Sequence, residues 1–306
     1  MATRNILVVG ATGKQGGAVV KALLGLPKSN PPIHILALTR DASSARAKAL
    51  ADSSNGLVEP IQGDATNPKP IFDSKPKRSI HELFLVTTPG KATEESQAIP
   101  FIDAAAEHGV KHIVFSSVDR GGDARSWENP TDIPHFLAKH NIELYLRDKA
   151  AKSKFTWTIL RPTAFLDNFS PGFFGSMFPA MWYKSLSPDT KLQLVSTNDI
   201  GVFAAKALTE PTDKWAGKAV SLAGDEITLA EAKDKFKKVV GKELPQTFTV
   251  LGAALLWGVK ELGTMFSFFE KEGYGADITA LKKEVPVQDF ETWLRECSKW
   301  KDQIQK

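Results

Sequence analysis

The sequence has little cysteine and no marked excess of charge of either sign. Among its 306 residues the one cysteine is Cys297, which excludes an internal disulfide and a metal centre built from several cysteines. This fits a reducing compartment, so we expect a cytoplasmic protein, with the nucleus as the other compartment that fits. The 39 Lys and Arg residues are scattered and only slightly outnumber the 35 Asp and Glu residues. We therefore expect no nucleic-acid partner and no metal.

The sequence also lacks a hydrophobic run long enough to span a membrane. Its longest apolar region, Thr247 to Phe269, is interrupted by Lys260 and Glu261 before it reaches the ~20 apolar residues that a span needs. We expect this region to form a buried or pocket-lining helix. At the N-terminus an apolar strand begins within the first few residues, which leaves no room for a secretion signal. We therefore expect neither a membrane partner nor secretion.

Short apolar runs alternate with helical patterns through the first half of the chain. The runs are NILVVG, IHILALT, GLVEPI, ELFLVTT, KHIVFSS and FTWTILR, and the main helices are expected at Lys14 to Leu24, Ser43 to Asp52, Thr93 to His108 and Pro134 to Ser153. Strands without polar alternation are typical of a parallel sheet that is covered on both faces. The pattern predicts an α/β fold, a Rossmann-type doubly wound parallel sheet.

The regular alternation ends near Pro162. The following stretch is aromatic, rich in glycine and proline, and poor in charge, which indicates a second lobe. The chain then returns to the core through KLQLVSTNDIGVFAAKAL and KAVSLAG. We expect a core of residues 1–162, continued by about 190–225, and a smaller, mostly helical substrate or partner lobe of residues 163–189 and 226–306. The two parts are therefore expected to be interleaved in sequence.

The glycine cluster GATGKQGG follows the first strand and opens the first helix. Its Gly10, Gly13 and Gly16 form G-x-x-G-x-x-G. Glycine allows the tight turn and lets the backbone approach a pyrophosphate, while the helix N-terminus offers free N–H groups and positive dipole. In this strand–turn–helix setting the cluster predicts a nucleotide-phosphate site rather than a plain turn.

The end of the second strand distinguishes between nicotinamide cofactors. An Arg there accepts the 2′-phosphate of NADP, whereas an acidic residue binds the ribose hydroxyls of NAD. The sequence is LALTRD, which places Arg40 at the strand end and favours NADP(H). Asp41 is the alternative, because it would serve NAD if the register differed by one residue.

Two further segments end strands at the same carboxyl edge of the sheet, where ligands bind in open α/β folds. Asp64 in QGDAT would accept the adenine amino group, or would form only a Gly-Asp turn. VTTPG, Thr87 to Pro89, closes the fourth strand. Both segments are therefore candidates for contact with a nucleotide.

These motifs make the chain similar to the NmrA-like family of atypical short-chain dehydrogenases/reductases. The resemblance covers nearly the whole length and also includes HFLAK, ILRPTAFLDNF, LAGDEITLAEA and GYGADI. It implies a Rossmann core that binds NADP(H) through Gly10, Ala11, Thr12, Gly13, Lys14, Gln15, Gly16, Arg40, Asp64, Ala65, Thr87, Thr88, Pro89, Lys139, Phe165 and Asn168. One departure is Ser44, where some members carry a second basic residue; Arg46 or Lys48 would compensate.

Short-chain dehydrogenases use a Tyr-x-x-x-Lys pair to move the proton. The literal match, Tyr145 and Lys149, lies ten residues beyond His135 on the helix that starts near Pro134, about 15 Å from the cofactor edge at 1.5 Å per residue. We interpret it as a decoy. His135 stands instead where the tyrosine would be, as in several NmrA-like proteins, and Lys139 is in place to hold the ribose. His135 and Lys139 are the catalytic candidates, although a histidine near a helix start is also an ordinary packing or surface residue.

Two functional hypotheses remain open at this point. The first is an NADPH-dependent oxidoreductase that reduces a small apolar or aromatic substrate, bound by some of the aromatic residues of the second lobe. Most of those aromatics are expected to be core: Phe169, Phe173, Phe174, Phe178, Trp182, Trp257, Phe266, Phe268 and Phe269. The second is a non-catalytic sensor of NADPH and NADP+ that regulates a partner protein, which the lack of a tyrosine at position 135 favours.

Overall fold

The computed structural model describes residues 3–27, 31–88, 90, 92–210, 212–247 and 260–304. Its main feature is a seven-stranded sheet in the order β3-β2-β1-β4-β5-β6-β9. The strands are β1 Arg4–Val9, β2 Ile33–Thr39, β3 Val58–Gln62, β4 Ile80–Val86, β5 His112–Ser116, β6 Thr156–Pro162 and β9 Lys218–Leu222. The pairs from β3 through β6 are parallel. The predicted Rossmann-type doubly wound sheet is confirmed, and the strand order reverses between β1 and β4, where such folds bind ligands.

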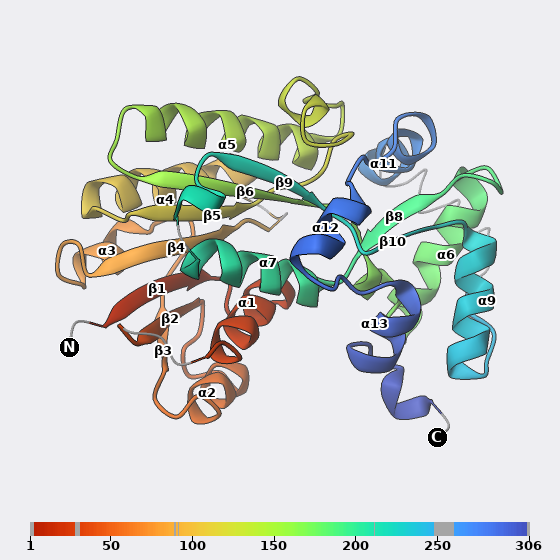
Figure 1. The fold of residues 1–306 in the computed structure, drawn as a ribbon, viewed down its shortest axis with the longest axis horizontal. Coiled ribbons are helices and arrows are strands. Elements are labelled where there is room, and N and C mark those ends of the chain that lie inside the picture. Colours follow the sequence, from red (N-terminus) through yellow and green to blue (C-terminus); the bar gives the residue numbers. More distant parts are fainter. Residues whose placement is uncertain are drawn as a thin grey trace. The chain divides into compact units, whose positions relative to one another are not determined.

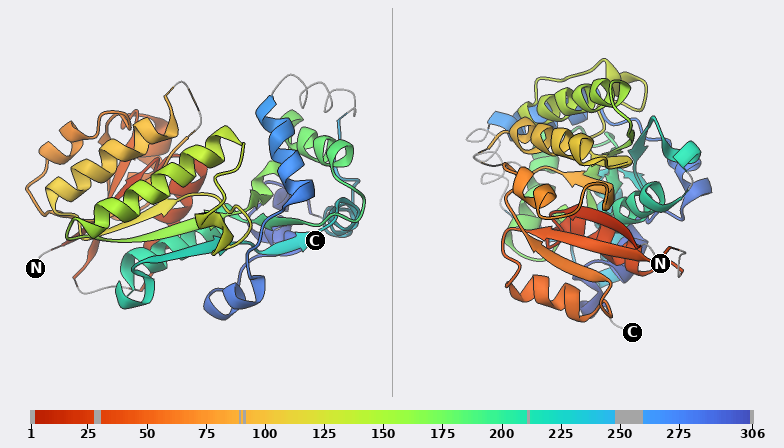
Figure 2. Two further views of the ribbon diagram at one scale, coloured as in Figure 1. Left: turned by 90° about the horizontal axis from the view of Figure 1, so that it is seen from above. Right: turned by 90° about the vertical axis from the view of Figure 1, so that its left-hand side faces the viewer.

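Helices cover both faces of this sheet. Figure 1 shows α3, α4 and α5 on one face and α1, α2 and α7 on the other, and the views in Figure 2 agree. Their bounds are α1 Lys14–Leu24, α2 Ala45–Asp52, α3 Lys69–Asp73, α4 Glu94–His108, α5 Pro134–Ala151 and α7 Thr197–Thr209, with the short α8 at Thr212–Trp215. The four predicted helices differ from the observed ones by two residues at most. Because both faces are covered, most residues of the middle strands are buried and apolar.

The remaining elements form a three-stranded sheet and a set of helices. The sheet has the order β10-β8-β7, with β8 parallel to β7 and antiparallel to β10. Its members are β7 Ala164–Phe165, β8 Leu192–Val195 and β10 Asp225–Ile227, and the helices are α6 Phe173–Ser185, α9 Leu229–Val240, α11 Lys260–Lys271, α12 Ile278–Glu284 and α13 Phe290–Glu296. A single aromatic cluster fills this part, in which Phe169, Trp182, Phe266 and Phe290 are almost fully buried.

Contacts divide the chain into two compact units. The first comprises residues 1–117, 138–161 and 200–220, and the second residues 118–137, 162–199 and 221–306. The segments 118–137 and 190–199, which the sequence analysis assigned to the core, thus group with the second unit. The reason lies in long-range bonds: Asp119 accepts a hydrogen bond from the backbone N–H of Gly275, and Gln193 exchanges two bonds with Ala276.

The apolar region from Thr247 to Phe269 lies partly outside the described residues. Of the predicted helix, the structure describes the part that belongs to α11, where Phe266, Phe268 and Phe269 are buried. Among the described helices, none combines the length and the apolar character that a membrane span requires. Within the same residues no group of three or more His, Cys, Asp and Glu side chains is arranged as a metal site.

His112 at the start of β5 couples the stability of the first unit to pH. Its ring nitrogens bond the hydroxyls of Thr156 and Thr158 at 2.7 and 3.0 Å, and burial lowers the pKa of His112 from 6.5 to about 4. The unfolded chain therefore takes up this proton first as the pH falls, so the stability present above pH 6.5 is lost progressively toward pH 4.

We expect His112 alone to lower the free energy of unfolding by about 2 kcal/mol between pH 7.5 and pH 5. The measurement is urea unfolding of the wild type and of His112→Gln at both pH values. The variant should be less stable at pH 7.5 but should show a smaller loss on acidification. His34→Gln is the control, and an unchanged pH dependence in His112→Gln would contradict the assignment.

Candidate functional site

The glycine loop lies at the carboxyl end of β1 and runs into α1. Gly10 adopts φ +66°, a left-handed conformation that favours glycine, and Gly13 is the N-cap of the helix. A Cβ atom on Gly16 would lie 2.2 Å from the carbonyl oxygen of Gly10, so the helix packs directly against the turn. The first N–H groups of α1 have no partner within the helix. The loop thus presents free donors and a positive helix end, which is what a phosphate requires.

Arg40 and Asp41 follow β2 on the strand next to the glycine loop. Arg40 is exposed, and its side chain has no hydrogen bond or ion pair within the described ranges. Asp41 is engaged locally: its carboxylate accepts bonds from the backbone N–H and the hydroxyl of Ser43 at 2.8 and 2.6 Å. These bonds lower the pKa of Asp41, the hydroxyl of Ser43 contributing most. Both bonds use Asp41 Oδ1, whereas the whole Arg40 guanidinium is unpaired within the described ranges, and the choice between the two residues stays a prediction.

Ser44, the position at which the chain departs from some family members, caps α2. Its hydroxyl accepts a bond from the backbone N–H of Ala47 at 3.3 Å. Arg46 and Lys48 lie on the same helix and are both exposed. Ser44 therefore has a structural role here. The positive charge that a basic residue at this position would supply is present nearby on α2, at Arg46 and Lys48.

Asp64 and Ala65 follow β3. The Asp64 carboxylate accepts the backbone N–H and the hydroxyl of Thr66 at 2.8 and 2.9 Å, and these bonds lower the pKa of Asp64. Both bonds use one oxygen, Oδ1, and Asp64 is exposed. The turn that the sequence analysis considered is therefore formed, and contact of Asp64 and Ala65 with adenine remains a prediction.

Lys139, Thr87 and Glu94 form a polar cluster at the carboxyl edge of the sheet. The ammonium of Lys139 lies 2.8 Å from Oε2 of Glu94 and donates a bond to Thr87 Oγ1 at 3.0 Å, and the Thr87 hydroxyl donates to Glu94 Oε2. The side chains of Lys139 and Glu94 are 11% and 4% exposed. Oε1 of Glu94 is buried without a hydrogen-bond partner in the part of the chain that the structure describes. Glu94 and Thr87 thus hold the ammonium of Lys139 in place, and Glu94 Oε1 remains an unused acceptor.

The neighbouring positions of the β4 loop are tied to α4. The backbone N–H of Thr88 donates to Gln97 Oε1 at 3.2 Å, and Gln97 Nε2 donates to the carbonyl of Thr88 at 2.8 Å. Pro89, the third predicted residue of this loop, lies outside the described residues. Gln97 thus fixes the backbone that follows β4 next to the cluster of Thr87 and Lys139.

Two serines at the end of β5 donate hydrogen bonds to side chains of neighbouring helices. Ser116 donates to Gln15 Oε1 in the glycine loop at 2.5 Å, and Ser117 donates to the carboxylate of Glu143. Glu143 in turn pairs with Arg161 at 2.7 Å, both side chains being fully buried. Gln15 is therefore held by β5 and helps to fix the start of α1.

Tyr145 and Lys149 are bound away from the cluster at the carboxyl edge. The Tyr145 hydroxyl donates to Asp103 at 2.7 Å, and Lys149 pairs with the same carboxylate at 2.5 Å. Asp103 lies nine residues after Glu94 on α4, about 14 Å along the helix at 1.5 Å per residue. This placement agrees with the interpretation of the Tyr-x-x-x-Lys match as a decoy, which stays a prediction.

His135, Phe165 and Asn168 belong to the second unit. His135 Nδ1 is bonded to Glu261 in the first turn of α11, and the same carboxylate accepts the backbone N–H of His135 at 3.3 Å. Phe165 ends β7 and Asn168 lies in the following short helix, both half-buried. The structure thus gives His135 an orienting carboxylate, which is the arrangement of an acid/base histidine as well as of a packed one.

The aromatic residues of the second unit are mostly core, as predicted. Phe178, Trp182, Phe266, Phe268 and Phe269 are all buried in the aromatic cluster. Phe173 and Phe174 at the start of α6 differ, with exposed fractions of 58% and 86%. Trp257 lies outside the described residues. The prediction that most of these aromatics are core is therefore confirmed for the described residues, and Phe173 and Phe174 are the exceptions.

Sequence reasoning missed Glu94, Gln97 and Glu261. Glu94 offered a weak signal, because an acidic residue after the capping Thr93 is ordinary in a first helical turn. Glu261 was treated only as a charge that interrupts an apolar run. Glu94 and Glu261 acquire their roles from partners far away in the sequence, 45 residues away for Glu94 and 126 residues away for Glu261.

Comparisons with known proteins agree with the fold and the motifs. Residues 2–301 match the model of the NmrA-like family. An NmrA-like family domain-containing protein of Dictyostelium discoideum is 24% identical over 97% of this chain and 98% of its own length. The NmrA-like oxidoreductase malD of Malbranchea aurantiaca is 25% identical, over 78% of this chain and 74% of its own length.

A repressor and a solved structure complete the comparison. The nitrogen metabolite repression protein nmr of Neurospora crassa is 25% identical over 78% of this chain, which matches 53% of that protein. The crystal structure of NmrA, a negative transcriptional regulator, in complex with NADP superposes with a TM-score of 0.73 at 18% identity, covering 97% of this chain and 96% of that chain. At this identity the superposition establishes the fold.

Proposed function

The chain belongs to the NmrA-like family, and from this premise we propose that it is an NADP(H)-dependent oxidoreductase that acts on a small apolar or aromatic substrate. The observation that carries the choice of cofactor is the state of Arg40 and Asp41: the carboxylate is bound to Ser43, and the guanidinium is exposed and without a partner among the described residues. An always-charged guanidinium at this strand end suits a 2′-phosphate. The related oxidoreductase malD supports the reaction class.

The residues of the first unit fit a dinucleotide. No Cβ fits between Gly16 and the carbonyl of Gly10, so the start of α1 packs directly on the turn and its free N–H groups lie where a pyrophosphate would bind. Glu94 Oε1 is a buried acceptor without a partner in the described part of the chain. We propose that Gly10 to Gly16 hold the pyrophosphate, Arg40 the 2′-phosphate, Asp64 and Ala65 the adenine, and Thr87, Thr88, Pro89 and Lys139 the nicotinamide half.

When bound, NADPH supplies the hydride, so the protein must orient it and provide a proton. In the proposed reaction Lys139, fixed by Glu94 and Thr87, donates hydrogen bonds to ribose hydroxyls. His135 donates the proton from its Nε2 atom, because Glu261 is bonded to Nδ1 and fixes the orientation of the ring. Both residues lie on α5, four positions apart.

Arg40→Ala is the experiment that tests the choice of cofactor. We expect at least a tenfold loss of affinity for NADPH and for NADP+, because a charge-assisted bond to phosphate is lost, and roughly unchanged affinity for NADH. The measurement is calorimetric titration of the cofactor-free protein with NADPH, NADP+, NADH and NAD+.

Two further variants sharpen this comparison. Arg46→Ala tests whether α2 supplies part of the charge, and Arg295→Ala, an exposed arginine on α13, controls for net charge. An equal loss for NADPH and NADH in Arg40→Ala would show that Arg40 does not read the 2′-phosphate. Failure of all four nucleotides to bind the wild type would remove the proposed function.

A second function, that of a sensor of NADPH and NADP+ which regulates a partner protein, is favoured by two observations. The related protein nmr of Neurospora crassa is a repression protein, and His135 occupies the position of the dehydrogenase tyrosine. Sensing requires that the two cofactor forms bind the partner-competent state with different affinity, because tight binding alone shifts no equilibrium. Near-equal affinity for NADPH and NADP+ together with saturable oxidation of NADPH by a small substrate would favour the enzyme.

A further inference from the structure

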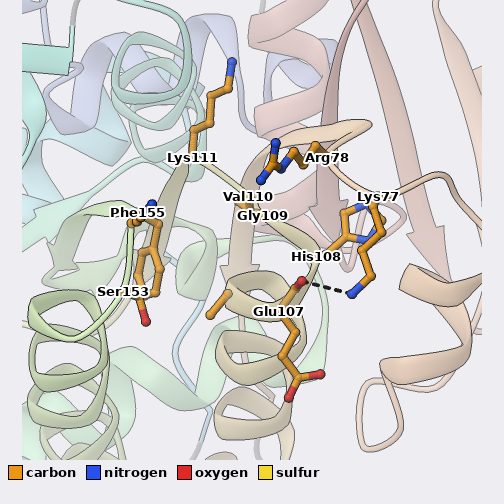
Figure 3. A pocket seen from close by; sticks show the side chains of 11 residues that line it. Lys77, Arg78, Glu107, His108, Gly109, Val110, Lys111, Ser153 and Phe155 are labelled. Atoms are coloured by element: carbon orange, nitrogen blue, oxygen red, sulfur yellow. Dashed lines mark hydrogen bonds between the residues drawn. The ribbon is translucent and has the colours of Figure 1, made fainter.

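The first unit contains a pocket at the edge of the sheet opposite to the glycine loop. Its volume is about 830 Å³, and its wall is formed by residues that precede or begin β4, β5 and β6 together with the ends of α4 and α5 (Figure 3). The glycine loop follows the carboxyl end of β1, whereas this pocket lies at the amino ends of the strands. With strands of five to seven residues at ~3.3 Å per residue, the two places are about 20 Å apart.

The rim of the pocket is strongly basic. Lys77, Arg78, Lys111 and Lys154 are all exposed lining residues. Lys77 donates a bond to the backbone carbonyl of Glu107 at 3.1 Å, and the side chains of the other three have no hydrogen bond or ion pair within the residues that the structure describes. Glu107 is the acidic residue of the lining, and Figure 3 shows its carboxylate directed away from Arg78 and Lys111. The pocket therefore has an excess of unpaired positive charge.

Capping of the C-terminal end of α4 does not account for this charge. α4 ends at His108, and its terminal carbonyls are already bonded: the backbone N–H of Arg78 donates to the carbonyl of His108 at 2.9 Å, and Lys77 binds that of Glu107. The guanidinium of Arg78 and the ammonium groups of Lys111 and Lys154 are not used in this capping. They are available for a ligand.

The floor of the pocket is buried and combines apolar atoms with one unused polar atom. Val110 and Phe155 are 2% and 5% exposed. His108 is 4% exposed, and its Nε2 atom is buried without a hydrogen-bond partner in the described part of the chain. A Cβ on Gly109 would lie 2.9 Å from Cγ of Arg78, so a glycine at this position makes room for the arginine stem.

We propose that this pocket is a second ligand site, for a small phosphorylated metabolite with an apolar or aromatic body. Arg78, Lys111 and Lys154 bind the phosphate group, the arginine through its planar pair of donors. The apolar body rests on Phe155 and Val110. The pocket volume lies in the range of sites for small molecules, ~300–1,000 Å³, and a basic stripe long enough for a nucleic acid is not part of the lining.

The test uses phenyl phosphate as the probe in a calorimetric titration of the full chain. We expect saturable binding by the wild type, weaker binding of inorganic phosphate, and a loss of at least about tenfold in Arg78→Gln/Lys111→Gln, because two charge-assisted contacts are removed. Lys282→Gln/Lys283→Gln on α12 removes the same charge from exposed positions and should bind like the wild type. If the double variant does not fold, Lys154→Gln takes its place as a milder change. We expect it to weaken binding of phenyl phosphate about threefold or more.

Three results would overturn the proposal: no binding to the wild type, equal loss in the Lys282 and Lys283 control, or equal affinity for phenyl phosphate and inorganic phosphate. Arg40→Ala distinguishes this pocket from the edge that carries the glycine loop. Unchanged affinity for phenyl phosphate in Arg40→Ala supports the second site, and a loss there would assign the binding to the other edge of the sheet.

Discussion

Gly16→Ala is expected to remove tight binding of NADPH and to destabilise the first unit. The new Cβ would lie 2.2 Å from the carbonyl oxygen and 2.5 Å from the carbonyl carbon of Gly10, distances that no side chain can occupy. Because both atoms are backbone, relief requires that α1 move away from the turn. Overpacking of this kind costs ~1–3 kcal/mol or more, and the moved N–H groups no longer converge on a phosphate.

Gly17→Ala is the matched control. The nearest atom to a Cβ at Gly17 is the carbonyl oxygen of Ala11, at 3.3 Å, and Ala is favoured over Gly inside a helix by ~1 kcal/mol. We expect Gly17→Ala to be about as stable as the wild type and to bind NADPH within a factor of about three. The measurements are urea unfolding and titration with NADPH. If Gly16→Ala binds NADPH as well as Gly17→Ala does, the close packing of loop and helix is not what forms the phosphate site.

The parts of the fold that the sequence predicted depend on local patterns. The strand that ends at Val9 and the helix Lys14–Leu24 follow from an apolar run and the glycines between them, and they are found where the pattern placed them. The boundaries of α4 are equally local, because Thr93 caps its start and Gly109 ends it in the left-handed conformation. Periodicity and capping are properties of neighbours in sequence, so they can be read without the fold.

The parts of the candidate site that could not be predicted depend on pairs that are distant in sequence. Lys139 was expected at the carboxyl edge because its helix starts near Pro134 and a helix that follows a strand begins at that edge, but its partner Glu94 lies on another helix. The choice between Arg40 and Asp41 also needed the structure, because the bonds from Ser43 to Asp41 depend on the turn after β2. The basic pocket required three separate segments to meet at the opposite edge of the sheet.

Lys139→Met is expected to be the most destabilising change at the carboxyl edge. It leaves the Glu94 carboxylate buried without its cation, and breaking a buried pair by removing one partner costs ~3–5 kcal/mol. Glu94→Gln leaves the opposite charge unpaired and should also destabilise. Both single variants will therefore lose cofactor binding and turnover partly because the first unit is less stable.

The double variant Lys139→Met/Glu94→Gln separates stability from function. It replaces the ion pair by groups of similar volume, so we expect its free energy of unfolding to return to within about 1–2 kcal/mol of the wild type. If Lys139 contacts the nicotinamide half of the cofactor, turnover should nevertheless stay at least ~100-fold below that of the wild type, since the ammonium is absent.

Urea unfolding, titration with NADPH and assays of NADPH oxidation on all four proteins complete this double-mutant cycle. Recovered stability with lost turnover would assign Lys139 to the reaction and Glu94 to its positioning. Recovered stability with recovered NADPH affinity and turnover would show that the pair only fastens α5 to α4, the two helices that this ion pair joins. The cycle thus distinguishes a buried ion pair kept for packing from one kept for chemistry, a distinction that burial and distance alone do not make.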